Sequence, residues 1–208
     1  MPYRPTEVTR RNAELKRASF LRAARSLVAA RGFGGATVAA IAGECGASVG
    51  SVYSYFDSRE YLLAEVFRSA AGHELATVRA AVAGAGSRAT DRLNALISTF
   101  AGRALQGRRL AWSLLFEPVD PAVDAERLIY RRSYTELGEE IIRAGIADCT
   151  FVAQDVALAA SAVMGAISEA LVGWLRPDDA DQPTTSDDDV VEGIRTFCFR
   201  ALGAEETQ

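Results

Sequence analysis

The sequence has little cysteine and almost no histidine. Three cysteines and one histidine occur among 208 residues, and Cys45, Cys149 and Cys198 lie far apart in the chain. Structural zinc sites need closely spaced ligands such as C-x₂-C, and a disulfide framework needs paired cysteines, so neither is predicted. We expect reduced, buried and unreactive thiols, no metal site and no cofactor.

An apolar leader is also missing. The first fifteen residues carry charges without the run of 7–15 apolar residues that follows them in a secretory signal peptide. We therefore expect a cytoplasmic protein. The hydrophobic fraction of 49% is sufficient for a packed core, which excludes a fully disordered chain. The length allows one domain, or a small domain fused to a larger one.

Alternating strand patterns are absent, and apolar residues recur at helical spacing through the whole chain. The sequence therefore predicts an all-α fold. Thr37, Ser48 and Ser58 are predicted N-caps, and Asp120 followed by Pro121 is a further strong start signal. The predicted helices cover residues 12–31, 38–44, 49–55, 59–83, 88–105, 109–116, 121–147, 154–175 and 188–203.

One long apolar run requires a membrane test. Residues 156–175 contain a single charge, Glu169, and are long enough to span a bilayer. The run is rich in alanine, glycine and serine and lacks basic flanks, so we expect a core or oligomer-interface helix and no membrane contact. The following segment, 176–189, holds six aspartates without the spacing of a calcium loop, and we expect a solvated acidic loop.

The net charge of −4 conceals an asymmetry between the two parts of the chain. Residues 1–60 hold nine basic and five acidic side chains, a net charge of +4. Residues 61–208 hold 14 basic and 22 acidic side chains, a net charge of −8. This division favours a small polyanion-binding module on a larger body, although a solvated basic helix face gives the same count.

The spacing of small and apolar residues between 37 and 62 predicts a helix-turn-helix. Ala42 is placed where two helices touch, Gly46 takes the turn four residues later, and Val52 returns to the core beside Ile41. The second helix then exposes small or hydrogen-bonding side chains that fit the DNA major groove. These side chains are Ser48, Gly50, Ser51, Ser54 and Tyr55.

This stretch resembles the N-terminal domain of the tetracycline-repressor-like (TetR) regulators. The resemblance rests on Thr37, Ile41-Ala42, Gly46, Ser48, the run Val52-Tyr53-Ser54-Tyr55-Phe56, and Ser58-Arg59-Glu60. Counting the preceding helix, it covers about 50 residues. Cys45, Ala47 and Arg59 are minor departures, standing where alanine, valine and lysine are usual. Beyond residue 65 only the helical layout is similar.

The resemblance implies a role for each matched residue. Thr37 would contact a phosphate, while Ser48, Val49, Gly50 and Ser51 would meet base edges or adjacent phosphates. Tyr53 and Tyr55 would donate hydrogen bonds to phosphates, and Arg59 would bind another phosphate. For Tyr53 the alternative is an inward aromatic, as we expect for Phe56. Arg10, Arg11 and Lys16 are further candidates for backbone or minor-groove contact.

The resemblance also implies a body that binds a small-molecule effector and dimerises. The helices at 154–175 and 188–203 would form the homodimer interface, and two DNA-binding domains would read a palindromic operator on double-stranded DNA. Glu169 is expected to be a buried carboxylate whose partner is a cationic or hydroxylated ligand or an arginine across the dimer. Ordinary core packing is the alternative for each pocket candidate, and these are Phe100, Leu105, Trp112, Leu115, Phe116, Tyr130, Tyr134, Met164, Glu169 and Trp174.

No constellation for catalysis is visible. His73 has no G-x-S-x-G serine to activate, and the glycines near Gly46 lack the lysine of a phosphate loop. The predicted function is a ligand-responsive DNA-binding repressor, not an enzyme, with a DNA-binding domain at 1–60 and an effector-binding and dimerisation domain at 61–208. A ligand-independent regulator or activator and a helical protein–protein adaptor are the alternatives.

Overall fold

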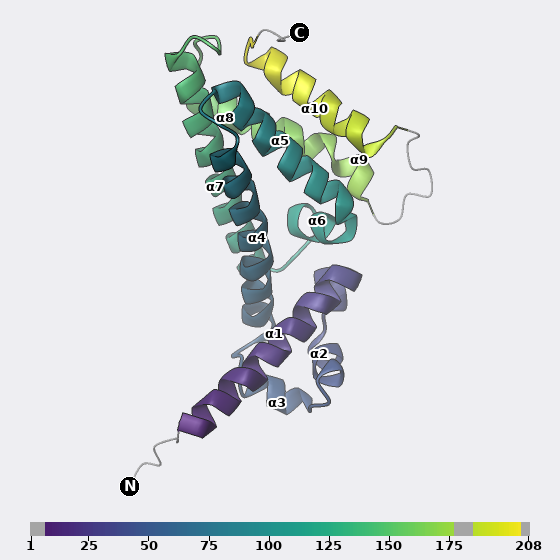
Figure 1. Ribbon diagram of the computed structural model, residues 1–208. Coiled ribbons are helices and arrows are strands. Elements are labelled where there is room, and N and C mark those ends of the chain that lie inside the picture. Colours follow the sequence, from purple (N-terminus) through teal and green to yellow (C-terminus); the bar gives the residue numbers. More distant parts are fainter. Residues whose placement is uncertain (1–6, 177–184, 205–208) are drawn as a thin grey trace.

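The computed structural model describes residues 7–176 and 185–204, and these residues form helices and no strand. The all-α prediction is therefore confirmed. Figure 1 shows the helices in chain order. They are α1 (Glu7–Gly35), α2 (Val38–Glu44), α3 (Val49–Tyr53), α4 (Arg59–Gly84), α5 (Ala89–Gln106), α6 (Arg108–Leu115), α7 (Pro121–Ala147), α8 (Val156–Ala170), α9 (Val172–Leu175) and α10 (Asp187–Ala201).

The predicted N-caps are confirmed. The side chains of Thr37, Ser48, Ser58 and Asp120 each accept a hydrogen bond from the backbone amide three residues later. Such a bond satisfies one of the amides that the first turn of a helix leaves unpaired, and it fixes where the helix begins. The starts of α2, α3, α4 and α7 are thus encoded locally.

Two helices depart clearly from their predicted ranges, and the ends of the others lie within two residues of the predicted ones. Helix α1 begins at Glu7 instead of residue 12, and none of residues 7–19 is buried, so this part projects from the fold and leaves no apolar periodicity in the sequence. Helix α1 also has a kink at Gly32, where φ is 75°. The predicted helix at 154–175 is divided at Leu171 into α8 and α9.

The helices enclose two hydrophobic cores. The first core holds α1, α2, α3 and the first half of α4 together, and it includes Phe20, Ile41, Phe56 and Phe67. The second core joins α5, α7, α8 and α10 with the end of α4. Helix α4 runs from the first core into the second. The predicted domain boundary at residue 60 lies in the first turn of α4, and this boundary stays a proposal.

The apolar segment Val156–Leu175 is long and apolar enough to cross a membrane, with a mean hydropathy of 1.8, but 33% of it is buried in the chain. Helix α8 packs Ala159, Ala160 and Val163 inward, while Leu158 remains 70% exposed. The helix is therefore not fully buried in the single chain, and the expected role of its exposed side in an oligomer interface stays a prediction. Most of the acidic loop expected at 176–189 lies outside the described residues.

The cysteines have three different environments, so the expectation that all are buried is wrong. Cys198 is fully buried, and burial raises the pKa of its thiol to about 11. Cys45 is half-buried, and Cys149 is exposed in the turn after α7. The φ of Cys149 is 61°, a backbone conformation that the fold imposes where α7 ends.

Candidate DNA-binding surface and effector cavity

Helices α2 and α3 form the predicted helix-turn-helix. Gly46 turns the chain with a φ of 57°, and the amide of Ala47 donates to the carbonyl of Ala42 at 2.9 Å. Ile41, Ala42 and Val52 are at most 2% exposed, so they fix the crossing of the two helices. A glycine is required at position 46 because other residues rarely adopt this backbone conformation.

The N-terminal end of α3 presents an open surface. Ser48, Val49 and Gly50 are exposed, and Ser51 is half-buried. A Cβ atom added at Gly50 would have no neighbour closer than the Ser48 Oγ at 4.0 Å, so space is not what requires glycine there. The missing side chain instead leaves the backbone of the first turn open to a close partner.

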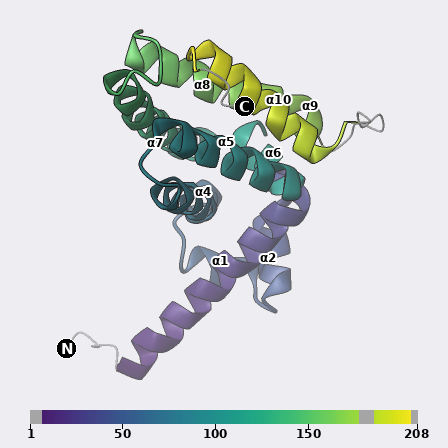
Figure 2. The same ribbon diagram turned by 45° about the horizontal axis from the view of Figure 1, so that its top comes forward.

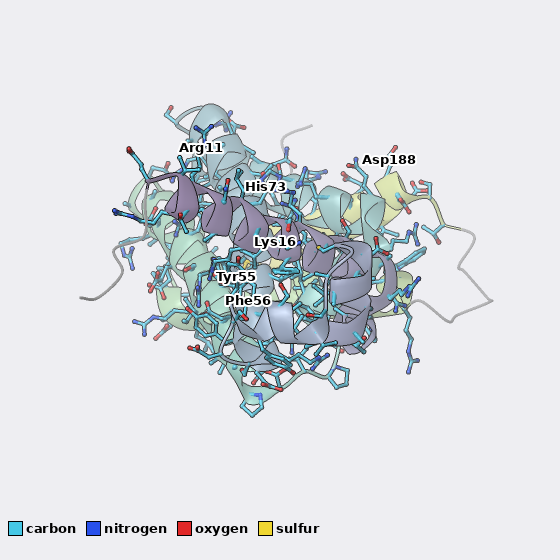
Figure 3. All side chains as sticks on the ribbon, turned by 90° about the horizontal axis from the view of Figure 1, so that it is seen from below. Arg11, Lys16, Tyr55, Phe56, His73 and Asp188 are labelled. Carbon is cyan, nitrogen blue, oxygen red and sulfur yellow. The ribbon has the colours of Figure 1, made fainter. Side chains whose placement is uncertain are left out.

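The two tyrosines of α3 and the turn after it are placed differently. Tyr53 is 50% exposed, whereas the inward-facing Phe56 is only 2% exposed. Tyr55 is half-buried, and its ring lies 5.7 Å from that of Phe20 in α1. Figure 3 shows Tyr55 and Phe56 beneath α1 in the view from below. Tyr53 is thus free to contact DNA, whereas Tyr55 is partly used in packing.

Thr37 and Arg59 contribute to the surface in different ways. Thr37 is exposed; its oxygen caps α2, and its hydroxyl proton remains available for an acceptor. Arg59 is half-buried and donates from a guanidinium nitrogen to the carbonyl of Phe33 at 2.7 Å. Arg59 therefore ties α4 to the end of α1, a structural contact that the sequence did not predict.

The basic side chains of α1 are only partly available. Arg10 and Arg11 are exposed on the projecting part of the helix. Lys16 lies over the ring of Phe20, 5.2 Å from its centroid. Arg17, which the sequence count treats as free charge, pairs with Glu65 at 2.6 Å. The surplus positive charge of the first 60 residues is therefore carried mainly by the exposed arginines.

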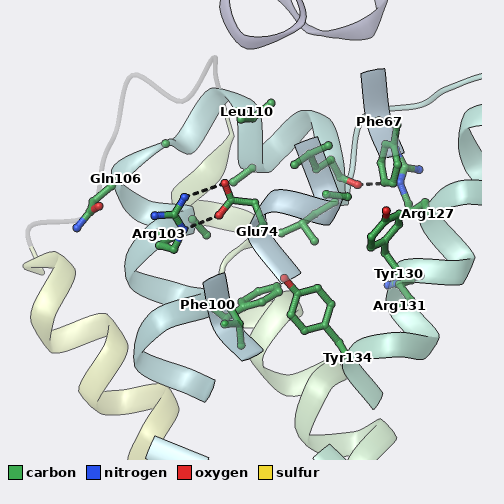
Figure 4. A pocket seen from close by; sticks show the side chains of 17 residues that line it. Phe67, Glu74, Phe100, Arg103, Gln106, Leu110, Arg127, Tyr130, Arg131 and Tyr134 are labelled. Atoms are coloured by element: carbon green, nitrogen blue, oxygen red, sulfur yellow. Dashed lines mark hydrogen bonds and ion pairs between the residues drawn. The ribbon is translucent and has the colours of Figure 1, made fainter. Parts of the chain in front are cut away.

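A cavity of about 340 Å³ lies between α4, α5, α6 and α7 (Figure 4). Its size is within the range of small-molecule sites. Gln106, Gly107 and Arg131 are exposed lining residues, so the cavity opens to solvent. The lining residues are Phe67, Ala71, Glu74, Val78, Phe100, Arg103, Ala104, Gln106, Gly107, Leu110, Ala111, Leu114, Leu115, Arg127, Tyr130, Arg131 and Tyr134.

Four of the ten pocket candidates, Phe100, Leu115, Tyr130 and Tyr134, line this cavity. The other six do not; Leu105 is buried in the second core, and Trp174 packs against it. Trp112 and Phe116 form a ring pair at 5.4 Å and pack against the second core, as does Met164. Glu169 is exposed on α8 in the single chain, because one side of α8 has no neighbouring helix, so it is not a buried carboxylate within one copy. A partner for Glu169 across a dimer stays a prediction.

The sequence reasoning missed the charged residues of the cavity. Glu74 and Arg103 form a bidentate ion pair in its wall, with N···O distances of 2.6 and 2.9 Å (Figure 4). The hydrogen bond to Glu74 raises the pKa of Arg103. Glu74 lies three residues from Ala71 and four from Val78, both buried in α4, and Arg103 lies three residues from the half-buried Phe100 in α5. That spacing was the available signal.

Tyr134 places a polar hydroxyl group among the aromatic residues of the cavity. Its ring meets that of Phe100 edge-on at 5.1 Å, and its hydroxyl points toward the cavity (Figure 4). Burial, followed by the charge of Glu74, raises the pKa of Tyr134, so the phenol stays protonated. The hydroxyl has no hydrogen-bond partner among the described residues, and it is available to donate to a bound molecule.

Two family descriptions match the chain. Residues 20–66 match "Bacterial regulatory proteins, tetR family", and residues 86–196 match "Tetracyclin repressor-like, C-terminal domain". Among characterised proteins, the HTH-type transcriptional repressor KstR2 of Rhodococcus jostii is 33% identical over 168 residues, which cover 78% of this chain and 80% of that protein.

Solved structures share the whole fold. The fatty acid degradation regulator FadR of Bacillus halodurans has a TM-score of 0.74 at 20% identity, covering 91% of this chain and 97% of its own. FadR of Bacillus subtilis, solved in complex with stearoyl-CoA, has a TM-score of 0.71 at 20% identity, covering 91% and 99%. The chain belongs to the tetR family of bacterial regulatory proteins.

Proposed function

We propose that the chain acts as a homodimer that binds a palindromic operator and releases it when a coenzyme A thioester occupies the cavity between α4, α5, α6 and α7. The observation that carries the proposal is this cavity, which combines aromatic walls with a partly buried ion pair. The relatives of this chain are transcriptional regulators. We infer that the chain acts in the cytoplasm and that its effector-binding body binds the effector without transforming it.

An unpaired apolar face on α8 and α10 supports the homodimer. Leu158 of α8 is 70% exposed and Phe197 of α10 is 61% exposed. Gly165 and Gly193, on the same two helices, have nothing within 4 Å of an added Cβ, so a partner helix has room to approach closely. Figure 2 shows α8 and α10 together on the side of the body away from α1–α3. Two copies joined there would each leave a DNA-binding domain free.

The geometry of duplex DNA supports a palindromic operator. Recognition helices of a symmetric helix-turn-helix dimer reach two half-sites about 34–36 Å apart, or a multiple of that spacing. In each copy, Ser48, Val49, Gly50 and Ser51 would read bases, while Thr37, Tyr53 and Tyr55 would contact phosphates. Arg59 would contribute to a phosphate contact with the nitrogens that do not bind the Phe33 carbonyl.

The chemistry of the cavity supports a coenzyme A thioester. Phe100, Leu110 and Leu114 offer apolar walls for an acyl group, and Tyr134 offers a hydroxyl to a carbonyl oxygen. Arg131, which is exposed where the cavity meets solvent, offers a cation to the phosphates of coenzyme A. The stearoyl-CoA complex of Bacillus subtilis FadR is a precedent within the same fold.

Thermal unfolding with three probes tests the effector class. Stearoyl-CoA, stearate and free coenzyme A are each titrated into the purified protein. We expect stearoyl-CoA to raise the melting temperature most, because binding to the native state stabilises it by about 2.7 kcal/mol at a hundred times the Kd. A protein that regulates without a ligand would respond to none of them, and equal responses to stearate and stearoyl-CoA would contradict a role for the coenzyme A group.

The phosphate role of Tyr53 gives a first mutational prediction. Tyr53→Phe removes one exposed hydroxyl and leaves the ring, so the fold is unchanged. We expect affinity to fall by a similar factor, about tenfold or less, on all DNA sequences, because a phosphate contact carries no base information. Fluorescence anisotropy with several duplexes measures this, and a loss confined to one base pair would contradict the role.

Ser51 gives the contrasting prediction. Ser51→Ala removes a hydroxyl in the first turn of α3, and the helix cap survives because Ser48 binds the backbone amide of residue 51. We expect a changed preference at particular bases, worth about 1–3 kcal/mol at the contacted pair. Selection from a randomised operator library, with Tyr53→Phe as the control, measures the preference. An unchanged profile would remove Ser51 from the readout.

A further inference from the structure

The loop between α6 and α7 holds the end of α1 through one carboxylate. The two oxygens of Glu117 accept hydrogen bonds from the amides of Phe33 at 3.0 Å and Gly34 at 2.9 Å. Phe33 and Gly34 follow the kink at Gly32 and lead directly into α2. Glu117 belongs to the effector-binding body, so a polar contact of the body positions the start of the DNA-binding motif.

Gly32 is required by this contact. A Cβ atom added at Gly32 would lie 2.5 and 2.6 Å from the two carboxylate oxygens of Glu117. The φ of 75° at Gly32 also disfavours other residues. The missing side chain therefore leaves room for the carboxylate of Glu117, and the backbone conformation at Gly32 is one that glycine adopts readily.

Arg127 fixes the segment that carries Glu117. From α7, its guanidinium donates to the carbonyls of Leu114 at 2.9 Å, Glu117 at 2.8 Å and Ser113 at 3.4 Å. The side chain of Arg127 is only 12% exposed, and Asp124 pairs with it at 3.2 Å. Burial lowers the pKa of Arg127, so its charge relies on these oxygen partners.

Arg127 also lines the cavity (Figure 4). Leu114, whose carbonyl Arg127 binds, lines it as well. A molecule in the cavity therefore touches the residue that holds the end of α6 in place. Such contact changes the position of Leu114 or competes for the guanidinium, and either effect shifts the carboxylate of Glu117.

We propose that Arg127 and Glu117 are positioning residues that connect the effector cavity to the DNA-binding domain. Occupancy of the cavity loosens the hold of Arg127 on the end of α6, and Glu117 then releases the amides of Phe33 and Gly34. The effect reaches the DNA surface because the carbonyl of Phe33 is bound by Arg59, and Thr37, the cap of α2, follows four residues later.

The proposal rests on the proposed function only for the identity of the occupant, so its test uses an occupant that is part of the chain. Ala104, 7% exposed and in the cavity wall, is changed to Met, which fills part of the cavity. Ala80→Met, at an exposed site on α4, is the matched control. Amide hydrogen exchange at Phe33 and Gly34 is measured by NMR in both variants, without DNA or effector.

We expect Ala104→Met to accelerate exchange at Phe33 and Gly34 by about tenfold, the factor that corresponds to about 1.4 kcal/mol of protection, and Ala80→Met to leave it unchanged. In Glu117→Gln and in Arg127→Met, we expect exchange at these amides to be fast already. Adding Ala104→Met to either variant should then change the exchange rate less than twofold. Glu117→Gln keeps one acceptor oxygen, so it provides a folded background should Arg127→Met fail to fold.

An unchanged exchange rate in Ala104→Met would overturn the proposal. A tenfold response that persists in Glu117→Gln would also overturn it, because the coupling would then run through α4 alone. Stearoyl-CoA gives a second occupant: if it fails to bind while Ala104→Met accelerates exchange, the proposed effector is wrong and the connection stands.

Discussion

Phe197→Glu is expected to convert the protein to a monomer and to reduce operator affinity by about a hundredfold or more. Phe197 is 61% exposed on α10, in the proposed dimer face. A carboxylate there would be buried without a partner when two copies associate, which disfavours the dimer. The loss in affinity follows because a dimer gains its second half-site contact intramolecularly, an advantage of about 10²–10⁴.

Leu128→Glu provides the matched control for this experiment. Leu128 is 58% exposed on α7, outside the proposed interface. Leu128→Glu should leave both the sedimentation coefficient and the operator affinity close to the wild-type values. If Phe197→Glu sedimented as a dimer with full operator affinity, the α8 and α10 face would not be the dimer interface.

Phe67→Ala should cause the largest loss of stability, about 3–5 kcal/mol of unfolding free energy, the usual cost of emptying an aromatic site in a core. Phe67 is 2% exposed on α4, and its ring centroid lies 6.0 Å from those of both Phe33 and Tyr130. The substitution therefore removes packing between the DNA-binding domain and the body and enlarges the cavity that Phe67 lines.

Denaturant unfolding measures this loss, at one protein concentration because association with a second copy would add to the apparent stability. Tyr61→Ala is the control, since Tyr61 lies on the same helix and is 47% exposed. We expect the control to change stability by about 0.5 kcal/mol or less. Equal losses in the two variants would show that Phe67 does not join the two parts of the chain.

The helices of the DNA-binding domain could be predicted because their signals are local. The side chain of Thr37 reaches an amide three residues away, and Gly46 sets its turn through its own φ. Ile41 and Val52 point inward at a spacing that the sequence displays directly. The exposure of Tyr53 followed from the motif position, since periodicity alone also allowed an inward ring.

The cavity could be predicted only in part, because its walls come from four helices whose facing sides the sequence does not specify. Phe100 and Tyr134 were found as aromatic residues at core spacing. The charges of Glu74 in α4 and Arg103 in α5 neutralise each other, and nothing in the sequence around either residue indicates that they pair. Glu169 was predicted to be buried because its helix is apolar all round, but one side of that helix is exposed in the single chain.

The contact between Glu117 and the end of α1 had no signal in the sequence. It joins residues more than 80 positions apart, and Glu117 lies in a short loop that looks like an ordinary exposed turn. The predicted helix at 12–31 ends just before the kink at Gly32, but the approach of a carboxylate to this glycine is visible only in three dimensions.

Selection of genomic DNA fragments by the purified protein tests the central claim most directly, followed by addition of stearoyl-CoA to the bound complexes. Salt is kept at a roughly physiological concentration, where nonspecific attraction is weak. We expect enrichment of a short palindrome, its loss in Phe197→Glu, and its release by stearoyl-CoA. No enrichment by protein that is folded, dimeric and refolded free of bound ligand would contradict a ligand-responsive DNA-binding repressor.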